Sequence, residues 1–257
     1  MKMLGKIWWM PLLVYIIVVP ALMSARVDSI PCRKIDIRVS DSLDYRFVTR
    51  SRIFNIVQSD TRNILGKRSA EIDSRKIEKD IDAINELERA EVYYTIDGVL
   101  HVEADQRDPV LRLITRYGKS YYIDSHDMII PHSRVFTPRV IVVSGYIDIP
   151  PENLASRSLV TMSPDSDIRR VVEFVEYING DPFWSGQVEQ VWINPQGEPE
   201  IVPRMGNHII RFGTLDDYRG KLSHLEVFYR EVMPEVGWNS YREINLRYDG
   251  QIVCKKR

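Results

Sequence analysis

An uncharged apolar segment near the N-terminus constrains this chain more than any other feature. Residues 7–25 read IWWMPLLVYIIVVPALMSA and contain no charged side chain. A helix of that length, at about 1.5 Å per residue, would reach roughly 28 Å, close to the hydrocarbon thickness of a bilayer. Trp8 and Trp9 stand at its start, where indole rings favour the membrane interface. The segment therefore predicts a transmembrane helix over 7–25.

A cleaved signal peptide is the alternative for the same segment. Lys2 and Lys6 would form its basic region, and residues 23–25 would form its cleavage site. The apolar run exceeds the usual ~7–15 residues of a signal peptide, which favours the uncleaved anchor. Long domains translocate largely regardless of flanking charge, so we expect residues 1–6 inside the cell and the rest outside. This predicts a single-pass membrane protein.

Composition excludes several classes of protein. The chain has 257 residues, with 35 Lys and Arg against 36 Asp and Glu. This balance provides no basic stripe for nucleic acid, and 44% hydrophobic residues exclude disorder of the whole chain. The two cysteines, Cys32 and Cys254, are too far apart in sequence for a CxxC metal site. Two unpaired thiols are the favoured interpretation.

Residues 30–105 alternate between strand and helix patterns. Apolar residues at every second position over 35–39 predict a half-buried strand. Thr49 and Asp73 are expected N-caps of two amphipathic helices. Two β-rich runs then flank an Asp-Gly pair at 97–98, the pattern typical of a hairpin with a type I′ turn. The order strand-helix-helix-strand-strand predicts a three-stranded sheet with two helices on one face.

Residues 106–257 are predicted to be mostly β. Six strands are expected, over 111–114, 121–123, 139–143, 188–193, 200–202 and 209–212. Helical spacing interrupts them at 168–178 and 217–232. The fold class expected for the whole chain is α+β, with a mostly antiparallel β domain at the C-terminus.

The sequence contains no recognisable catalytic constellation. The GxSxG motif and the glycine loops that bind phosphate are absent. The five histidines are scattered, and the nearest pair, His126 and His132, has no metal-ligand spacing. We therefore predict no catalytic residue, no cofactor and no metal. The alternating end of the chain, over 242–254, instead predicts a terminal strand whose edge could accept a partner strand.

The order of several short motifs resembles a known family. The strand and helix pattern up to the exit over 106–110 resembles a POTRA module. The motifs YYID at 121–124, DPFW at 181–184 and INLRYD at 244–249 then follow in the order of the bacterial cell-division family FtsQ (DivIB). The ending GQIVCKK at 250–256 is similar to the Bacteroidetes branch.

The resemblance implies a non-enzymatic divisome scaffold in the inner membrane at the division septum. Its POTRA domain (30–105) and β domain (106–257) would lie in the periplasm. In that family the terminal strand receives the small coiled-coil protein FtsB, itself paired with FtsL. By position, this partner-binding role falls on six residues: Arg247, Tyr248, Gly250, Gln251, Ile252 and Val253. We expect Tyr248 to be the anchor, since aromatic rings often dominate interfaces.

Two other functions are alternatives to this one. A membrane-anchored or secreted enzyme acting on envelope glycan would need two facing carboxylates in the β domain. A POTRA module of an outer-membrane assembly system would be followed by a large barrel, for which the remaining residues are too few.

Overall fold

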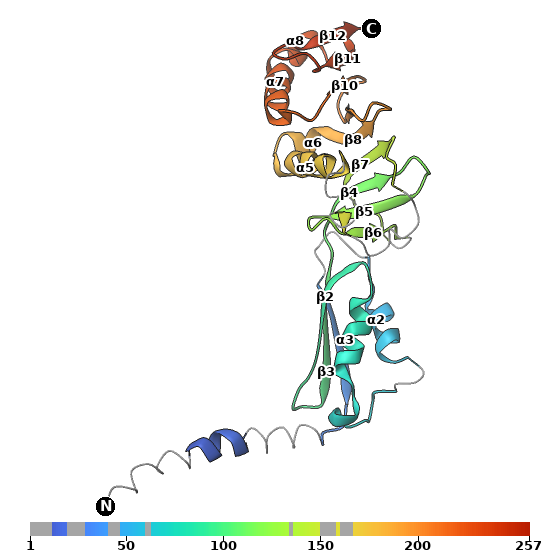
Figure 1. The fold of residues 1–257 in the computed structure, drawn as a ribbon, viewed down its shortest axis with the longest axis vertical. Helices are drawn as coiled ribbons and strands as arrows, with labels where there is room; N and C mark the ends of the chain where they lie inside the picture. The colour runs from blue at the N-terminus through green and yellow to red at the C-terminus, as the bar shows by residue number, and fades with distance from the viewer. Residues whose placement is uncertain are drawn as a thin grey trace, which may run out of the picture. The chain divides into compact units, whose positions relative to one another are not determined.

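The computed structural model describes most of the chain (Figure 1). The described residues are 12–19, 29–40, 47–59, 63–133, 136–149, 158–159 and 167–257. The chain divides into two compact units, residues 1–106 and residues 107–257.

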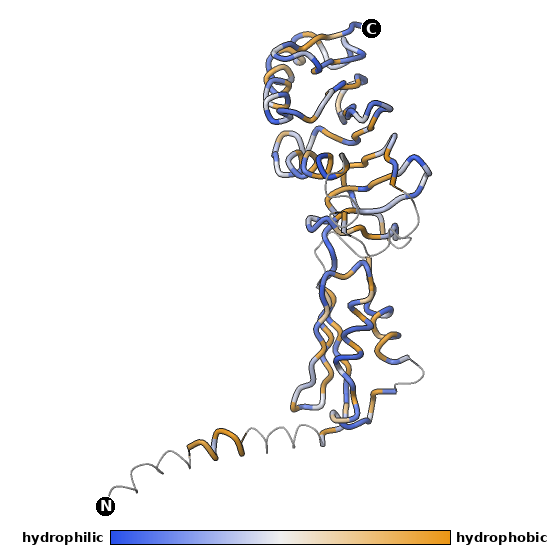
Figure 2. Tube along the Cα trace, viewed as in Figure 1, coloured by the Kyte–Doolittle hydropathy of each residue, from blue (hydrophilic) through white to orange (hydrophobic). Residues whose placement is uncertain are grey.

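The prediction of a transmembrane helix over 7–25 is wrong. In the described part of that segment, a helix covers residues 12–19. Its residues are mostly apolar, as the colour of the trace shows (Figure 2). Throughout the described residues, no helix is both long and apolar enough to cross a bilayer. The single-pass inner-membrane placement, with a cytoplasmic N-terminus and a periplasmic bulk, is overturned with it. The tail predicted at 1–6 lies outside the described residues.

The N-terminal unit contains a three-stranded sheet in its described part, in the order β1-β3-β2. Strand β1 is parallel to β3, and β2 is antiparallel to it. The elements are β1 (Lys34–Ser40), α2 (Arg50–Val57), the 3-10 helix η2 (Ser69–Glu71), α3 (Ser74–Asp82), β2 (Leu87–Tyr94) and β3 (Val99–Gln106).

Alternation of side chains determines which face of this sheet is covered. Leu100 and Val102 of β3 are fully buried, while His101 and Glu103, which alternate with them, lie on the opposite face. The expected caps are confirmed: the Thr49 hydroxyl accepts from the Arg52 N–H at 3.3 Å, as the α2 cap. Asp73 likewise accepts from the Lys76 N–H at 3.0 Å at the start of α3.

The β2–β3 hairpin is confirmed, but its turn is not of type I′. That type needs positive φ at both central residues. Only Gly98 has it, at 84°; Asp97 does not. The Gly98 N–H donates to the Thr95 carbonyl, and a Cβ on Gly98 would lie 2.9 Å from the Pro31 carbonyl oxygen. Glycine is therefore required here for both conformation and space.

The C-terminal unit contains a nine-stranded sheet in its described residues, in the order β12-β11-β10-β9-β8-β7-β4-β5-β6. Its strands are β4 (Pro109–Ile114), β5 (Ser120–Asp124), β6 (Ile129–Pro131), β7 (Ile141–Gly145), β8 (Val188–Ile193), β9 (Pro199–Pro203), β10 (Ile209–Arg211), β11 (Tyr241–Asn245) and β12 (Val253–Lys256). Its helices are α5 (Asp167–Gly180), α6 (Trp184–Gln187), α7 (Tyr218–Glu231) and α8 (Met233–Val236).

This sheet is mixed rather than uniformly antiparallel. Of its eight neighbouring strand pairs in the described residues, five are antiparallel and three parallel. Helix α5 connects β7 to its parallel neighbour β8, and α7 connects β10 to β11. Parallel neighbours need such crossovers, because a tight turn joins only antiparallel strands. Both helices bury one face against the sheet, with Phe174, Leu225 and Tyr229 in the shared core.

A buried carboxylate organises the β5–β6 turn. The Asp124 side chain is 2% exposed and accepts from Arg107 Nη1 at 2.7 Å. It also accepts from the backbone N–H groups of His126 at 2.9 Å and Met128 at 2.7 Å. The turn forces Asp127 to a φ of 59°. Removing the carboxylate would take away one acceptor that the Arg107 guanidinium and the two backbone N–H groups share.

We expect Asp124→Ala to lower the free energy of unfolding of the C-terminal unit by about 3 kcal/mol. Denaturation of the full chain, followed by fluorescence of Trp184, Trp192 and Trp238, measures it, since all three lie in this unit. Glu226→Ala is the control, because the Glu226–Arg230 pair is on the surface and should contribute less than about 1 kcal/mol. Equal losses in the two variants would contradict this role of Asp124.

A buried histidine makes the same unit sensitive to acid. His208 Nε2 lies 2.6 Å from the Tyr229 hydroxyl, and both residues are 2% exposed. Burial lowers the pKa of His208; the nearby Trp238 carbonyl opposes this, and the positive charge of Arg257 adds to it. The folded chain thus favours neutral imidazole, and its full stability is present above the pKa of the unfolded state.

Lowering the pH from 7.5 to 5.5 should destabilise the unit through His208 by at most about 1.4 kcal/mol, because the unfolded-state imidazole, with an ordinary pKa of about 6.5, is mostly protonated only over the lower of these two pH units. Denaturation at each pH should show a shallower loss for His208→Gln, whose amide can still bond Tyr229. His224→Gln, at an exposed position on α7, should keep the wild-type pH dependence. An unchanged slope in His208→Gln would refute the assignment.

Candidate functional site: the C-terminal sheet edge

Strand β12 forms one edge of the nine-stranded sheet. It pairs with β11 alone, with Cys254 opposite Ile244 and Val253 opposite Asn245. The Arg257 N–H donates to the Ser240 carbonyl on the β11 side. Because backbone groups alternate along a strand, those of Cys254 and Lys256 face away from β11. Within the described residues, neither has a hydrogen-bond partner for these outward groups.

The single terminal strand expected over 242–254 is a hairpin instead. Its loop, residues 246–252, separates β11 from β12. The Asn245 side chain accepts from the Arg247 N–H at 3.0 Å, and Gly250 has a φ of 67°. An Asp-Gly pair at 249–250 is the turn signal that could have revealed this break. Of the six predicted site residues, only Val253 lies on a strand; Arg247, Tyr248, Gly250, Gln251 and Ile252 lie in the loop.

Two of these residues hold the loop in place. The Arg247 guanidinium bonds the Glu198 carboxylate of the β8–β9 turn. Ile252 is half-buried and packs against the core of the unit. Tyr248 and Val253 differ, since 58% and 45% of their surfaces are exposed. The structure therefore divides the predicted set into residues that position the loop and residues that are open to contact.

A pocket of about 340 Å³ lies between this loop and helix α7. Lys221, His224 and Val227 line it from α7, and Tyr248 and Gln251 line it from the loop. The three α7 residues recur every third position and so share one helix face. Sequence reasoning missed them; the signal was Val227, an apolar residue off the buried stripe, which is 58% exposed.

The start of α7 is held rigidly beside the pocket. Asp217 caps the helix from a φ of 48°, and its carboxylate accepts from the Gly220 N–H at 3.3 Å. Lys221 Nζ donates to the carbonyls of Thr214 at 2.7 Å and Phe212 at 3.4 Å. These two hydrogen bonds tie the Lys221 ammonium group to the 212–214 segment, so Lys221 stabilises the fold as well as lining the pocket.

The chemistry of this region is that of a contact surface. Within the described ranges, His, Cys, Asp and Glu form no group of three that could hold a metal ion. Burial raises the pKa of the Cys254 thiol, so the thiolate form is disfavoured. What the region offers is outward backbone N–H and C=O groups, an exposed ring and a shallow pocket, which suit recognition of an extended peptide.

Comparison with known proteins agrees with both halves of this architecture. The family model described as "FtsQ/DivIB, C-terminal related" matches residues 108–255. A model described as a POTRA-like domain matches residues 30–105. No curated protein matches the chain significantly. These related domains point to a scaffold role in cell division, in a family of non-enzymatic type, with divisome proteins as partners in general. The chain belongs to the FtsQ/DivIB C-terminal-related family and carries a POTRA-like domain in front of it.

Proposed function

We propose that this chain is a non-enzymatic divisome scaffold that receives an FtsB-like coiled-coil protein at β12 and the adjoining loop 246–252. An FtsL-like protein, paired with the first, would be held indirectly. The observation that carries the proposal is the open edge of β12 beside the exposed Tyr248 ring. The POTRA domain (30–105) and the C-terminal β domain (106–257) are proposed as its two functional parts.

Backbone pairing would supply the affinity. The outward N–H and C=O groups of Cys254 and Lys256 are spaced to bond a further strand. Such strand addition uses main-chain bonds for affinity and alternate side chains for specificity. Val253 would contribute apolar contact next to this ladder, because nearly half of its surface is free.

The Tyr248 ring would supply the anchor. It stands on a loop fixed by the Arg247–Glu198 pair and by Ile252 in the core. A loop held in this way loses little entropy when a partner binds. Gln251 and Gly250 line the pocket beside the ring, where a partner side chain could enter. Arg247 and Ile252 therefore contribute to binding through the shape of the loop.

Tyr248→Ala should weaken binding of the FtsB-like protein at least about tenfold, as expected for an aromatic hot spot. Lys256→Pro should do the same, because proline removes an outward N–H without breaking the β11 ladder. The measurement is affinity capture of the tagged full chain, co-expressed with the FtsB-like and FtsL-like proteins, followed by titration of the purified complex. Circular dichroism verifies folding of each variant.

Tyr146→Ala is the matched control, since Tyr146 is 57% exposed in the same unit but away from β12. It should bind as the wild type does. If Tyr248→Ala and Lys256→Pro also bind like the wild type, the site is elsewhere. If the wild-type chain captures neither partner, the proposed function fails.

A further inference from the structure

The two edges of the POTRA-like sheet differ in how their backbone groups are satisfied. At the β2 edge, Asp82 Oδ1 accepts from the Ala90 N–H at 2.8 Å, and Glu78 Oε2 accepts from the Val92 N–H at 3.2 Å. Both carboxylates come from α3, one helical turn apart. They occupy the outward N–H groups of Ala90 and Val92, which obstructs pairing of a further strand along the middle of this edge.

Strand β1 forms the other edge of the sheet. Among the described residues, backbone pairing on its outer side is found only at residues 31–32, just before the strand begins. Cys32 donates its N–H to the Lys67 carbonyl and accepts from the Gly66 N–H, both at 2.8 Å. Next to it, Pro31 and Arg68 form an isolated antiparallel bridge. The chain's own 66–68 segment thus occupies the outer edge at residues 31–32.

Beyond that point the β1 edge is open within the described residues. The Arg33 N–H donates to Gly98 on the β3 side, so by alternation the backbone groups of Asp36 and Arg38 face outward. The Lys34 carbonyl accepts from the Cys32 thiol at 3.6 Å. No described residue bonds the outward N–H or C=O of Asp36 or Arg38.

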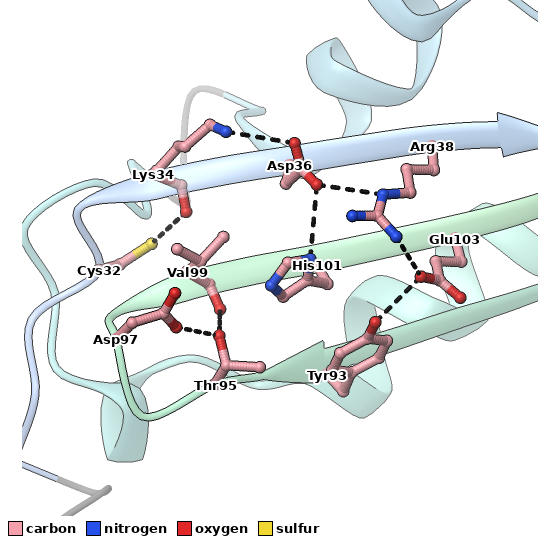
Figure 3. Close-up of polar contacts among 10 residues, drawn as sticks. All are labelled: Cys32, Lys34, Asp36, Arg38, Tyr93, Thr95, Asp97, Val99, His101 and Glu103. Atoms are coloured by element: carbon pink, nitrogen blue, oxygen red, sulfur yellow. Dashed lines mark hydrogen bonds and ion pairs between the residues drawn. The ribbon is translucent and has the colours of Figure 1, made fainter.

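The side chains along this open edge carry two accessible positive charges (Figure 3). Lys34 Nζ and Arg38 Nε each lie 3.3 Å from the Asp36 carboxylate, and His101 Nδ1 lies 3.5 Å from it. Asp36 is thus surrounded by donors, whereas the Lys34 and Arg38 side chains are both 66% exposed. Across β3, Glu103 is 3.6 Å from Arg38 and also accepts from the Tyr93 hydroxyl.

The opposite face of β1 is apolar. Ile35 and Ile37 are half-buried and Val39 is buried beneath the helices. A strand added at this edge would therefore place alternate residues beside Ile35 and Ile37, and the others beside Lys34, Asp36 and Arg38.

We propose that the β1 edge, residues 34–40, binds an extended segment of another protein in which acidic and apolar residues alternate. Backbone bonds to Asp36 and Arg38 would hold the segment, and its carboxylates would lie beside Lys34 and Arg38. This is a second docking edge in the N-terminal unit, independent of β12.

A Val-Glu alternating octapeptide is the probe, and a Val-Lys octapeptide is its counterpart. Titrated against the full chain, the acidic peptide should bind better than the basic one. The double variant Lys34→Glu with Arg38→Glu should reverse this preference, weakening the acidic peptide about tenfold, because like charges then face each other. Arg38→Pro should weaken both peptides, since it removes an outward N–H.

Arg89→Glu is the matched control. Arg89 is 65% exposed on β2, pairs with Glu91 and Asp105, and undergoes the same charge change at the opposite edge. It should bind the acidic peptide as the wild type does, and so should Lys256→Pro at β12. Hydrogen exchange in the complex should slow over 34–40 and remain unchanged over 87–94 and 253–256.

Several results would overturn the proposal. One is no binding of the acidic peptide to the folded wild-type chain at about 1 mM, the weak end of specific recognition. Another is slowed exchange at 87–94 or 253–256 in place of 34–40. A third is a dimer in sedimentation velocity that Arg38→Pro abolishes, which would assign the edge to a second copy of the chain.

Discussion

Every strand in this protein needs hydrogen-bond partners for its backbone N–H and C=O groups. Strands inside a sheet find them on both neighbours, whereas the edge strands β1, β2 and β12 differ in how these groups are satisfied. An unpaired edge is a template for another chain, so its treatment determines what the protein can bind. At the β2 edge, two carboxylates from α3 bond the outward N–H groups of Ala90 and Val92. The β1 edge is partly occupied by the 66–68 segment, and β12 has only β11 beside it. These three arrangements separate the surfaces that only support the fold from the surfaces available to partners.

The open edge at β12 depends on the packing behind it. Helices α5 and α7 act as crossovers that allow parallel neighbours in a mixed sheet, and their buried faces complete one core with the strands. The loop between β11 and β12 rests on that core through Ile252 and is tied to the β8–β9 turn through Arg247. An edge strand with a single neighbour keeps a defined position only because its connecting loop is fixed at both points.

Local features of the fold could be predicted from the sequence, and long-range ones could not. Thr49 and Asp73 act on N–H groups three residues away, so their capping follows from spacing alone. The prediction of a type I′ turn at Asp97-Gly98 was wrong, because an Asp-Gly pair does not by itself determine the φ angles of both central residues. The transmembrane prediction rested on composition, whereas no helix of the described residues is both long and apolar enough to cross a bilayer. The Arg247–Glu198 contact joins residues 49 positions apart, and no local sequence pattern predicts a contact over that separation.

The strand order of the C-terminal unit also has a consequence for synthesis of the chain. From β7 to β12, each new strand lies beside the one made before it. The growing polypeptide can therefore extend one side of the sheet strand by strand as it leaves the ribosome, and β12 is the last strand of this series. Unpaired edges invite aggregation during folding. Here each strand edge from β7 to β11 is covered by the next strand to be translated, so each of these edges is exposed only until its neighbour has been made.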